Sequence, residues 1–514
     1  MVAGDWGHNW SLLALRLPSI VYTFVTAAGL GLLAWRIRRD LRAVCLTVLL
    51  YLLFFSTFRY GRVYLTSAPE TFWLGLPLYW LLWVHTSTDN TQKATFQGFG
   101  PVAYTLFGLA MGLGLAYKSF ALIAPASATL WLAILLSATP QQGKRLPWSL
   151  VWKTTLGVGW SVVLALGIFS LWFVLDPDPA SVWAEFVVGE NAGKMSGQKG
   201  YWHAALHGDY PMWQQLFAYP ENAGLLALPV LGMGWFGLRQ LFGWRGLPSA
   251  SPAMVVLLVW LAVWLIVFTI PSQRSARYVI PAMPALALVM GLYWDRIAKP
   301  WHWLTVLVLL PALLIMARIA WVIQGMDVGS TVTGLWALLT LGSGMLLALW
   351  GLVRPRWSGV AALTTCLAIY AGFGAMVEPL SGPQAAYPPQ VKQQLNNALI
   401  AVPNGFTGQY ERYQFVLPGN RFNPYDIEGR NTGALKPELP PRERLAYLLA
   451  GHDAVVWLQK DLAQTQPSCV PACTVIGARW HVKSRHKSGE VTLDNLWYPQ
   501  QWLFRREWLI IKAK

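Results

Sequence analysis

The chain alternates long apolar runs with short polar segments from its start to about residue 377. A helix that crosses a bilayer needs about 20 mostly apolar residues, and about twelve runs approach that length. Two of these runs are separated only by Tyr117-Lys118-Ser119, which predicts a tight helical hairpin. The cores of the runs are Leu17–Trp35, Ala43–Phe58, Thr71–Val84, Pro101–Ala116, Phe120–Leu136, Thr155–Leu175, Gly224–Phe242, Ala253–Ile270, Val279–Trp294, Leu304–Ile323, Gly334–Val353 and Gly359–Val377.

Polar residues return in two long segments, a loop at about 176–222 and a tail at 378–514. Within the tail, Arg442–Leu449 has helical spacing, whereas Ala454–Leu458 and Trp502–Ile511 have the apolar character of buried strands. We therefore expect an α-helical polytopic membrane protein, with a transmembrane domain over 1–377 and a soluble mixed α/β domain over 378–514.

The composition supports a membrane protein. The chain is 55% hydrophobic and 12% charged, whereas soluble chains are about 45–50% apolar and about 25% charged. The net charge of +16 is typical of Lys and Arg in loops beside anionic lipid. No basic motif of a nucleic-acid-binding module is present, so we expect membrane lipids and no nucleic acid as partners.

The Lys and Arg residues of alternate loops predict the orientation. About fourteen lie on one side and about eight on the other, so the first side is cytoplasmic. An even number of spans then places both ends outside, with the soluble domain in the periplasm of a bacterial inner membrane. The outward cations are Arg16, Arg59, Arg62, Lys118, Lys194, Lys199, Arg274 and Arg277.

Several outward cations lie in very short loops, whose positions at one end of a helix bundle can converge. Arg offers a bidentate fork and Lys a mobile point charge, so such a group beside Tyr hydroxyls suits a phosphate. Ordinary contact with lipid headgroups would explain the same spacing. The candidate phosphate-binding residues are Arg59, Arg62, Lys118, Arg274, Arg277 and Tyr278.

Glu70 is the most informative carboxylate because it follows Pro69 at the outer start of the third apolar run. An ionisable group there is costly and often functional. Alternatively, Glu70 stabilises the N-terminus of a helix, because an acid in the first turn complements the helix dipole. The sequence shows no metal motif, and it predicts no specific cofactor.

The sequence also lacks nucleotide-binding and zinc-protease motifs, which disfavours an ATP-driven pump and a metalloprotease. Cys469 and Cys473 enclose a short segment of the soluble tail. In an oxidising compartment we expect them to form a disulfide.

Four stretches resemble the polytopic, lipid-dependent glycosyltransferases of the GT-C superfamily, which includes protein O-mannosyltransferases and lipid A aminoarabinose transferases. The most specific is Arg277-Tyr278-Val-Ile-Pro281-Ala-Met-Pro284, which is similar to the family's arginine-tyrosine motif with two prolines. The other three are Leu13-Ala-Leu-Arg-Leu-Pro-Ser19, Ser67-Ala-Pro-Glu-Thr-Phe-Trp73, and Trp183-Ala-Glu-Phe186 with Glu190-Asn191.

The resemblance implies a transferase that moves a sugar from a polyprenyl-phosphate donor to a lipid, glycan or protein acceptor at the outer membrane face. It also implies that Arg277 and Tyr278 hold the lipid phosphate. Family members usually begin with one more span and an outer loop that carries the principal catalytic acid, and this chain starts after the equivalent point. Glu70 is therefore the remaining candidate for the catalytic base.

Three other functions fit parts of the pattern. A transporter or flippase would have about twelve spans but also paired halves and charges at mid-membrane, which the sequence lacks. An O-antigen ligase or polymerase would share the large outer loop but needs no soluble tail of this length. A homologue that binds the lipid without turnover is compatible with the absent acid.

Overall fold

We analysed a computed structural model of the chain. It describes residues 12–63, 65–87, 98–138, 146–184, 187–188, 200–208, 210–242, 251–272, 274–326, 331–381, 387–404, 412–427, 441–459, 467, 472–483, 486 and 489–513. Contacts divide the chain into two units. One contains Arg16–Thr305 and Arg354–Leu363, and the other contains Val306–Val353 and the chain from Thr364 onward.

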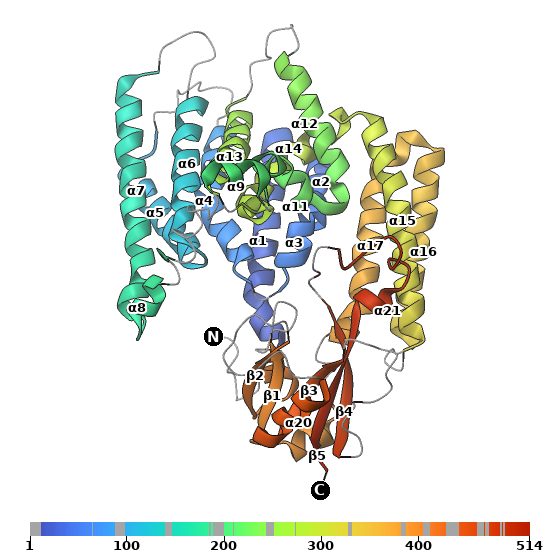
Figure 1. Cartoon of the computed structure of the whole chain (residues 1–514). Helices are drawn as coiled ribbons and strands as arrows, with labels where there is room; N and C mark the ends of the chain where they lie inside the picture. Colours follow the sequence, from blue (N-terminus) through green and yellow to red (C-terminus); the bar gives the residue numbers. More distant parts are fainter. Residues whose placement is uncertain are drawn as a thin grey trace. The chain divides into compact units, whose positions relative to one another are not determined.

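The described chain before residue 381 is helical (Figure 1). The helices that belong to the first unit are α1 (Leu12–Arg38), α2 (Leu41–Leu53), α3 (Phe55–Tyr60), α4 (Ser67–Ser87), α5 (Pro101–Ala116), η2 (Phe120–Leu122), α6 (Ile123–Ser137), α7 (Trp148–Leu175), α8 (Pro179–Val182), α9 (Tyr201–His207), α10 (Met212–Gln215), α11 (Ala218–Ala223), η4 (Gly224–Leu226), α12 (Ala227–Phe242), α13 (Pro252–Thr269), η5 (Ala276–Ala282), α14 (Met283–Tyr293), η6 (Trp294–Arg296) and η7 (Pro355–Trp357). Two further helices, α15 (Lys299–Gln324) and α17 (Ser358–Ser381), run from this unit into the other, and α16 (Thr331–Val353) lies in the other.

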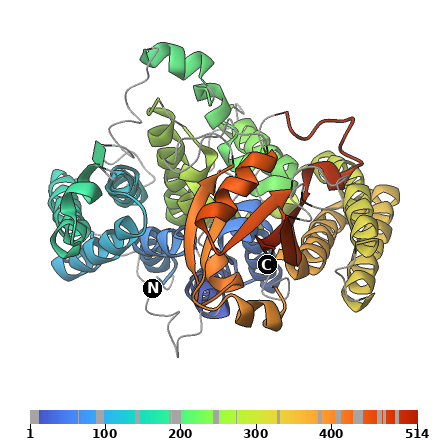
Figure 2. The same ribbon diagram turned by 60° about the horizontal axis from the view of Figure 1, so that its bottom comes forward.

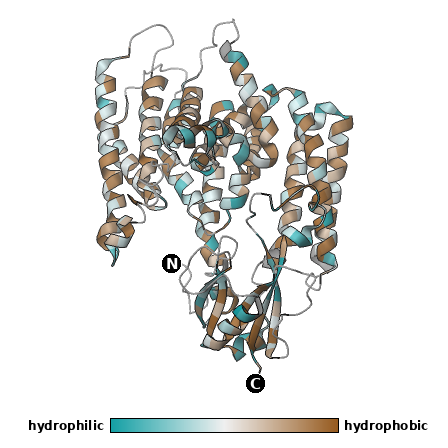
Figure 3. Ribbon diagram, viewed as in Figure 1, coloured by the Kyte–Doolittle hydropathy of each residue, from teal (hydrophilic) through white to brown (hydrophobic). Residues whose placement is uncertain are grey.

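The predicted polytopic helical architecture is confirmed. Every predicted apolar run falls on helical segments, and their apolar character is visible along α15, α16 and α17 (Figure 3). Among the described residues, 8 helical segments are long and apolar enough to cross a membrane. They are Leu13–Arg38, Phe120–Ser137, Trp148–Leu175, Pro252–Thr269, Ala276–Arg296, Lys299–Gln324, Gly334–Val353 and Pro355–Val377.

One predicted run is not a continuous helix. The run Ala43–Phe58 is divided at Phe54, whose extended backbone (φ −60°, ψ 133°) ends α2 and begins α3. The predicted single helix is therefore two helices, because an uninterrupted apolar sequence does not reveal a local change of ψ. After the break the chain forms the separate short helix α3. Arg59 lies in the last turn of this helix, and Arg62 follows its end by two residues.

Helices α5 and α7 pack closely through small residues. A Cβ added to Gly108 would lie 2.9 Å from the Ser161 carbonyl oxygen, so no side chain fits there. The Ser161 hydroxyl donates a hydrogen bond of 2.6 Å to the Tyr104 carbonyl of α5. Small residues that let backbones approach, with hydroxyl bonds between helices, are typical of membrane helix pairs. This packing fixes α5, whose C-terminal end leads directly to Lys118.

The soluble tail folds as a three-layer α/β arrangement around a five-stranded sheet of order β2-β1-β3-β5-β4 (Figure 2). Strand β1 pairs in parallel with β2 and β3, and β5 pairs antiparallel with β3 and β4. The predicted mixed α/β class is therefore confirmed. Its elements are α18 (Pro389–Gln394), β1 (Leu399–Asn404), α19 (Tyr413–Val416), β2 (Arg421–Asp426), α20 (Pro441–Gly451), β3 (Ala454–Gln459), β4 (Cys473–Val482), α21 (Pro499–Trp502) and β5 (Phe504–Lys512).

Alternate residues of the central strands build two separate cores. Ile400 and Leu509 face the side covered by α18 and α19, whereas Ala401 and Ile510 face the side covered by α20. This alternation is the period of two expected for a strand buried on both faces. Cys473 contributes to the α20 side and is disulfide-bonded. Its predicted partner, Cys469, lies outside the described residues, so the pairing stays a prediction.

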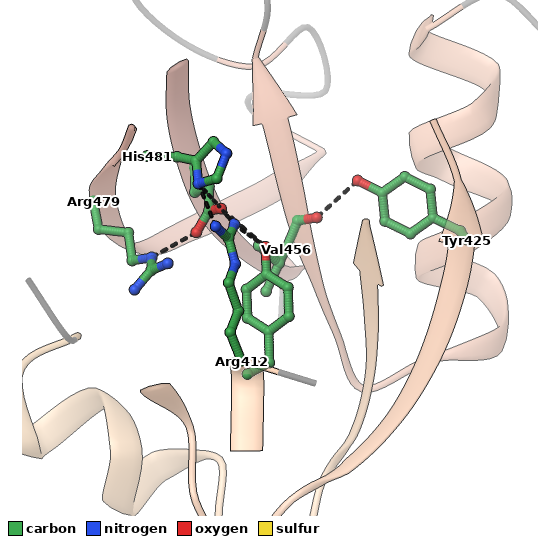
Figure 4. Close-up of polar contacts among 7 residues, drawn as sticks. Arg412, Tyr425, Val456, Arg479 and His481 are labelled. Carbon is green, nitrogen blue, oxygen red and sulfur yellow. Dashed lines mark hydrogen bonds and ion pairs between the residues drawn. The ribbon is translucent and has the colours of Figure 1, made fainter. Parts of the chain in front are cut away.

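A buried ionic cluster lies on the α18–α19 side of the sheet, centred on the fully buried Glu507 of β5 (Figure 4). Arg479 Nε donates to its carboxylate at 2.5 Å, the Tyr413 hydroxyl donates at 2.9 Å, and Arg412 forms a second ion pair. Burial alone would raise the pKa of Glu507, but Arg412 and Arg479 outweigh it and lower that pKa to about 2. Burial and the adjacent Arg412 lower the pKa of His481 to about 3, so this imidazole is neutral.

We expect Glu507→Gln to destabilise the soluble domain, because breaking a buried ion pair costs about 3–5 kcal/mol. The pKa of Glu507 is lowered from 4.5 to about 2, so its contribution is complete above pH 4.5 and is lost as the pH falls toward 2. Hydrogen–deuterium exchange of β5 in the intact protein should show a large loss of protection at pH 7 that shrinks below pH 4.5. The exposed Glu443→Gln is the control, and equal effects of both variants would contradict the role of the cluster.

Candidate functional site

The candidate site centres on a buried ion pair between Glu70 and Lys118. Glu70 lies in the first turn of α4, where its backbone N–H donates to the Thr66 carbonyl at 3.0 Å. Lys118 lies in the turn after α5, and its Nζ donates to both carboxylate oxygens of Glu70, at 3.2 and 3.1 Å. The Glu70 side chain is 0% exposed and that of Lys118 27%. The pair therefore has a buried anion and a cation that reaches the surface.

The second part of the site is η5, which carries the Arg-Tyr motif. The Ser275 hydroxyl accepts a bond of 3.4 Å from the Arg277 N–H at the start of this helix. Asn222 of α11 donates from Nδ2 to the Ala276 carbonyl at 2.6 Å. These two bonds fix the beginning of η5 and thereby the positions of Arg277 and Tyr278.

Tyr278 and Arg277 both lie within reach of the ion pair. Lys118 Nζ is 5.9 Å from the centre of the Tyr278 ring, which is a cation–π distance. The Tyr278 ring also stacks on Phe268, with 5.1 Å between the ring centres. Arg277 is exposed and directly precedes Tyr278 in η5. The structure thus brings together Glu70, Lys118, Arg277 and Tyr278.

Arg274 has a different environment from its neighbour Arg277. It is buried, and its guanidinium donates to the carbonyls of Thr269 at 2.8 Å, Tyr210 at 3.3 Å and Ala204 at 3.4 Å. These bonds tie the end of α13 to the large outer loop. The geometry therefore gives Arg274 a structural role, and its predicted contact with a phosphate gains no support from it.

Arg59 and Arg62 pack against aromatic rings of the short α3 segment. The Arg59 guanidinium lies 5.3 Å from the Tyr60 ring centre, and the Arg62 guanidinium 4.4 Å from that of Phe58. Arg62 also donates to the Phe58 carbonyl at 3.0 Å. The place of both arginines in a phosphate site stays a prediction.

The sequence analysis did not predict the group of aromatic side chains that lies beside the ion pair. Tyr22 packs against Phe72, Trp73 and Tyr117, with ring centres 5.3, 6.2 and 6.3 Å apart. Trp73 Nε1 donates to the Tyr22 hydroxyl at 3.1 Å. The available signal was the position of Tyr and Trp at the outer ends of apolar runs, which marks a membrane interface. Asn222 was also missed, since a lone Asn at a helix end carries no distinctive pattern.

The long polar loop at 176–222 is described only in part. Glu185, Glu190, Asn191 and Asp209 lie outside the described residues. The rings of His203 and His207 of α9 lie 5.6 Å apart and are tilted by 45° to one another. A search of the described residues finds no group of three or more His, Cys, Asp or Glu side chains that could hold a metal.

Glu70, Lys118 and Arg277 carry one negative and two positive charges, with the phenol of Tyr278 beside them. An anion that approaches the exposed Arg277 and the partly exposed Lys118 would meet an uncompensated positive charge. Guanidinium and ammonium groups are the usual protein ligands of phosphate. The arrangement can therefore bind a phosphate, with a carboxylate held next to it.

The sequence matches no family model, but it resembles curated transferases. It is 26% identical over 302 residues to undecaprenyl phosphate-alpha-4-amino-4-deoxy-L-arabinose arabinosyl transferase 1 of Sodalis glossinidius, covering 56% of this chain and 47% of that protein. It is 30% identical over 302 residues to the corresponding transferase of Pseudomonas aeruginosa, covering 56% and 48%. The chain thus spans about half the length of these relatives.

The fold is similar to two solved structures of ArnT from Cupriavidus metallidurans. The apo structure aligns with a TM-score of 0.52 at 15% identity, covering 96% of this chain and 83% of that one. The structure bound to undecaprenyl phosphate aligns with a TM-score of 0.51 at 15% identity, covering 97% and 84%. The chain is therefore a polytopic membrane protein whose fold is similar to that of ArnT over nearly its whole length.

Proposed function

We propose that this protein transfers a sugar from a polyprenyl-phosphate donor to an acceptor at the outer membrane face. The observation that carries the proposal is the Lys118–Glu70 ion pair, with both carboxylate oxygens on one ammonium and the Arg277-Tyr278 motif beside it. The names of the relatives support a donor built on undecaprenyl phosphate. A structural neighbour that binds undecaprenyl phosphate supports the same chemistry.

In this proposal the cations stabilise the leaving group. The acceptor attacks the anomeric carbon of the sugar, and the bond from that carbon to the phosphate oxygen breaks. The departing lipid phosphate gains one negative charge in this step. Lys118 and Arg277 are the two positive groups able to meet that charge, and a preorganised charge at a developing anion is usually the largest catalytic term.

Glu70 would act as the general base once Lys118 leaves it and binds the donor phosphate. Both of its oxygens accept from Lys118 Nζ, so the ammonium compensates the negative charge of the resting carboxylate and weakens it as a base. We propose that the donor phosphate draws Lys118 away, which leaves Glu70 unpaired beside the acceptor. Glu70 then takes the proton of the acceptor hydroxyl or amine as the new bond to the sugar forms.

Replacing Arg277 tests the phosphate site with little risk to folding, because Arg277 is exposed. We expect Arg277→Ala to weaken undecaprenyl phosphate binding about ten- to a hundredfold, since a charge-assisted hydrogen bond contributes roughly 1.5–3 kcal/mol. Binding would be measured with purified protein in nanodiscs. The control is Arg356→Ala, another exposed arginine, near the start of α17. If both variants bind equally weakly, or neither is impaired, the phosphate site lies elsewhere.

Replacing Glu70 separates catalysis from binding. Glu70→Gln keeps the shape and an oxygen for Lys118 but removes the base. We expect sugar transfer to fall by about a hundredfold or more, the range that general bases supply. Undecaprenyl phosphate binding should be kept or strengthened, because the negative charge that competes with the phosphate for Lys118 is gone. The assay follows release of undecaprenyl phosphate from its 4-amino-4-deoxy-L-arabinose conjugate, with lipid A as acceptor. A fully active Glu70→Gln protein would show that Glu70 only positions Lys118.

A second candidate function is lipid binding without turnover. The complete engagement of Glu70 by Lys118 favours it, because a buried ion pair of this kind is also a purely structural device. The two functions differ in one measurement. A non-catalytic protein would bind undecaprenyl phosphate through Arg277 yet release none from the sugar conjugate, and Glu70→Gln would then change neither result.

The location of the soluble domain is part of the proposal. We infer that it lies in the periplasm of a bacterial inner membrane, because the bias of Lys and Arg toward alternate loops places it outside. The disulfide at Cys473 supports an oxidising compartment. A reporter that is active only in the periplasm, fused after Lys514, should be active. Activity of a cytoplasm-only reporter at the same position would reverse the orientation.

A further inference from the structure

The segment 489–503 between β4 and β5 is an ordered turn. Asn495 fixes it from three directions. The Thr492 N–H donates to its Oδ1 at 2.8 Å, its Nδ2 donates to the Glu490 carbonyl at 2.8 Å, and Trp502 Nε1 donates to its carbonyl at 3.1 Å. The backbone of this turn is therefore held by its own hydrogen bonds.

This turn presents apolar side chains outward. Leu493 is 90% exposed, Trp497 and Tyr498 are each 49% exposed, and Val491 is 37% exposed. One exposed leucine is ordinary on a protein surface, but several large apolar groups on one ordered turn mark an interaction surface. The apolar groups include a Trp and a Tyr, the residues enriched where a protein meets the boundary of a bilayer.

The turn is attached to a membrane-spanning helix of the same unit. Arg318 of α15 donates from Nε to the Trp497 carbonyl at 3.2 Å, and its guanidinium lies 5.9 Å from the Trp497 ring centre. Arg318 precedes the end of α15 at Gln324 by six residues, which is about 9 Å along the helix. Trp321, one turn further along α15, is 67% exposed. The turn thus lies at the level of a lipid-facing tryptophan near a helix end.

We propose that segment 489–503 is embedded in the interfacial layer of the bilayer, on the side of the soluble domain, and anchors that domain to the membrane. Leu493 enters the upper part of the lipid chains, and Trp497 and Tyr498 lie at the headgroup level. Arg318 lies in an apolar helix, so a partner at the interface suits its long side chain. Asp494 must remain hydrated, which limits the insertion to this layer.

A second copy of the chain or another protein could cover the same side chains. The position of the turn favours lipid. It contacts Arg318 of α15, and the exposed Trp321 lies about one helical turn further along the same helix. A photoreactive residue separates these occupants. The photoreactive p-benzoyl-phenylalanine would replace Leu493 in the full-length protein, and, in a separate control, Tyr447 of α20, which is 59% exposed on the soluble domain. Both positions are exposed, so neither replacement disturbs a core.

After irradiation in phospholipid nanodiscs, we expect the probe at position 493 to form phospholipid adducts, on the order of tenfold more than the probe at 447. Mass spectrometry should locate the attachment near the glycerol end of the acyl chains. Adducts to protein at 493, whether to a second copy or to a different partner, would overturn the proposal. Equal lipid labelling at 493 and 447 would overturn it as well, because it would reflect only random contact.

Discussion

A charged carboxylate that is buried away from water is costly unless a partner compensates its charge, and the arrangement of the candidate site follows from the cation that does so. Glu70 is fully buried at the start of α4, so Lys118 has to reach it from the end of α5. This contact between Lys118 and Glu70 fixes the turn that joins the two helices of the hairpin. It also places the ammonium next to Tyr278, whose ring in turn packs on Phe268 of α13. One ion pair thus links α4, α5, η5 and α13.

The soluble domain contains a second buried carboxylate, and the two differ in how their charges are compensated. Glu507 is held by two arginines and a tyrosine hydroxyl, which satisfy it from several directions. Removing any one partner leaves the others in place, so this cluster is a structural device. Glu70 depends mainly on a single flexible side chain that is partly exposed. An incoming anion can compete for that side chain, whereas it has no access to Arg479.

The sequence predicted the features that depend on periodicity or on local composition. The helical hairpin around Lys118, the strand at Ala454–Leu458 and the terminal strand near Trp502–Ile511 all appear in the structure. It did not predict β1 or β2, because short strands such as Leu399–Asn404 and Arg421–Asp426 gain their stability from neighbours distant in the chain. Arg274 and Arg277 looked alike in sequence. Only the fold shows that one is occupied by backbone carbonyls while the other faces solvent.

The exchange of partners proposed for Lys118 also determines when the base becomes available. Leaving Glu70 unpaired in a buried site costs several kcal/mol, so Lys118 does not depart without compensation. The donor phosphate supplies that compensation for Lys118, and an acceptor hydroxyl or amine that donates to Glu70 supplies it for the carboxylate. A free base therefore exists only when both substrates are present.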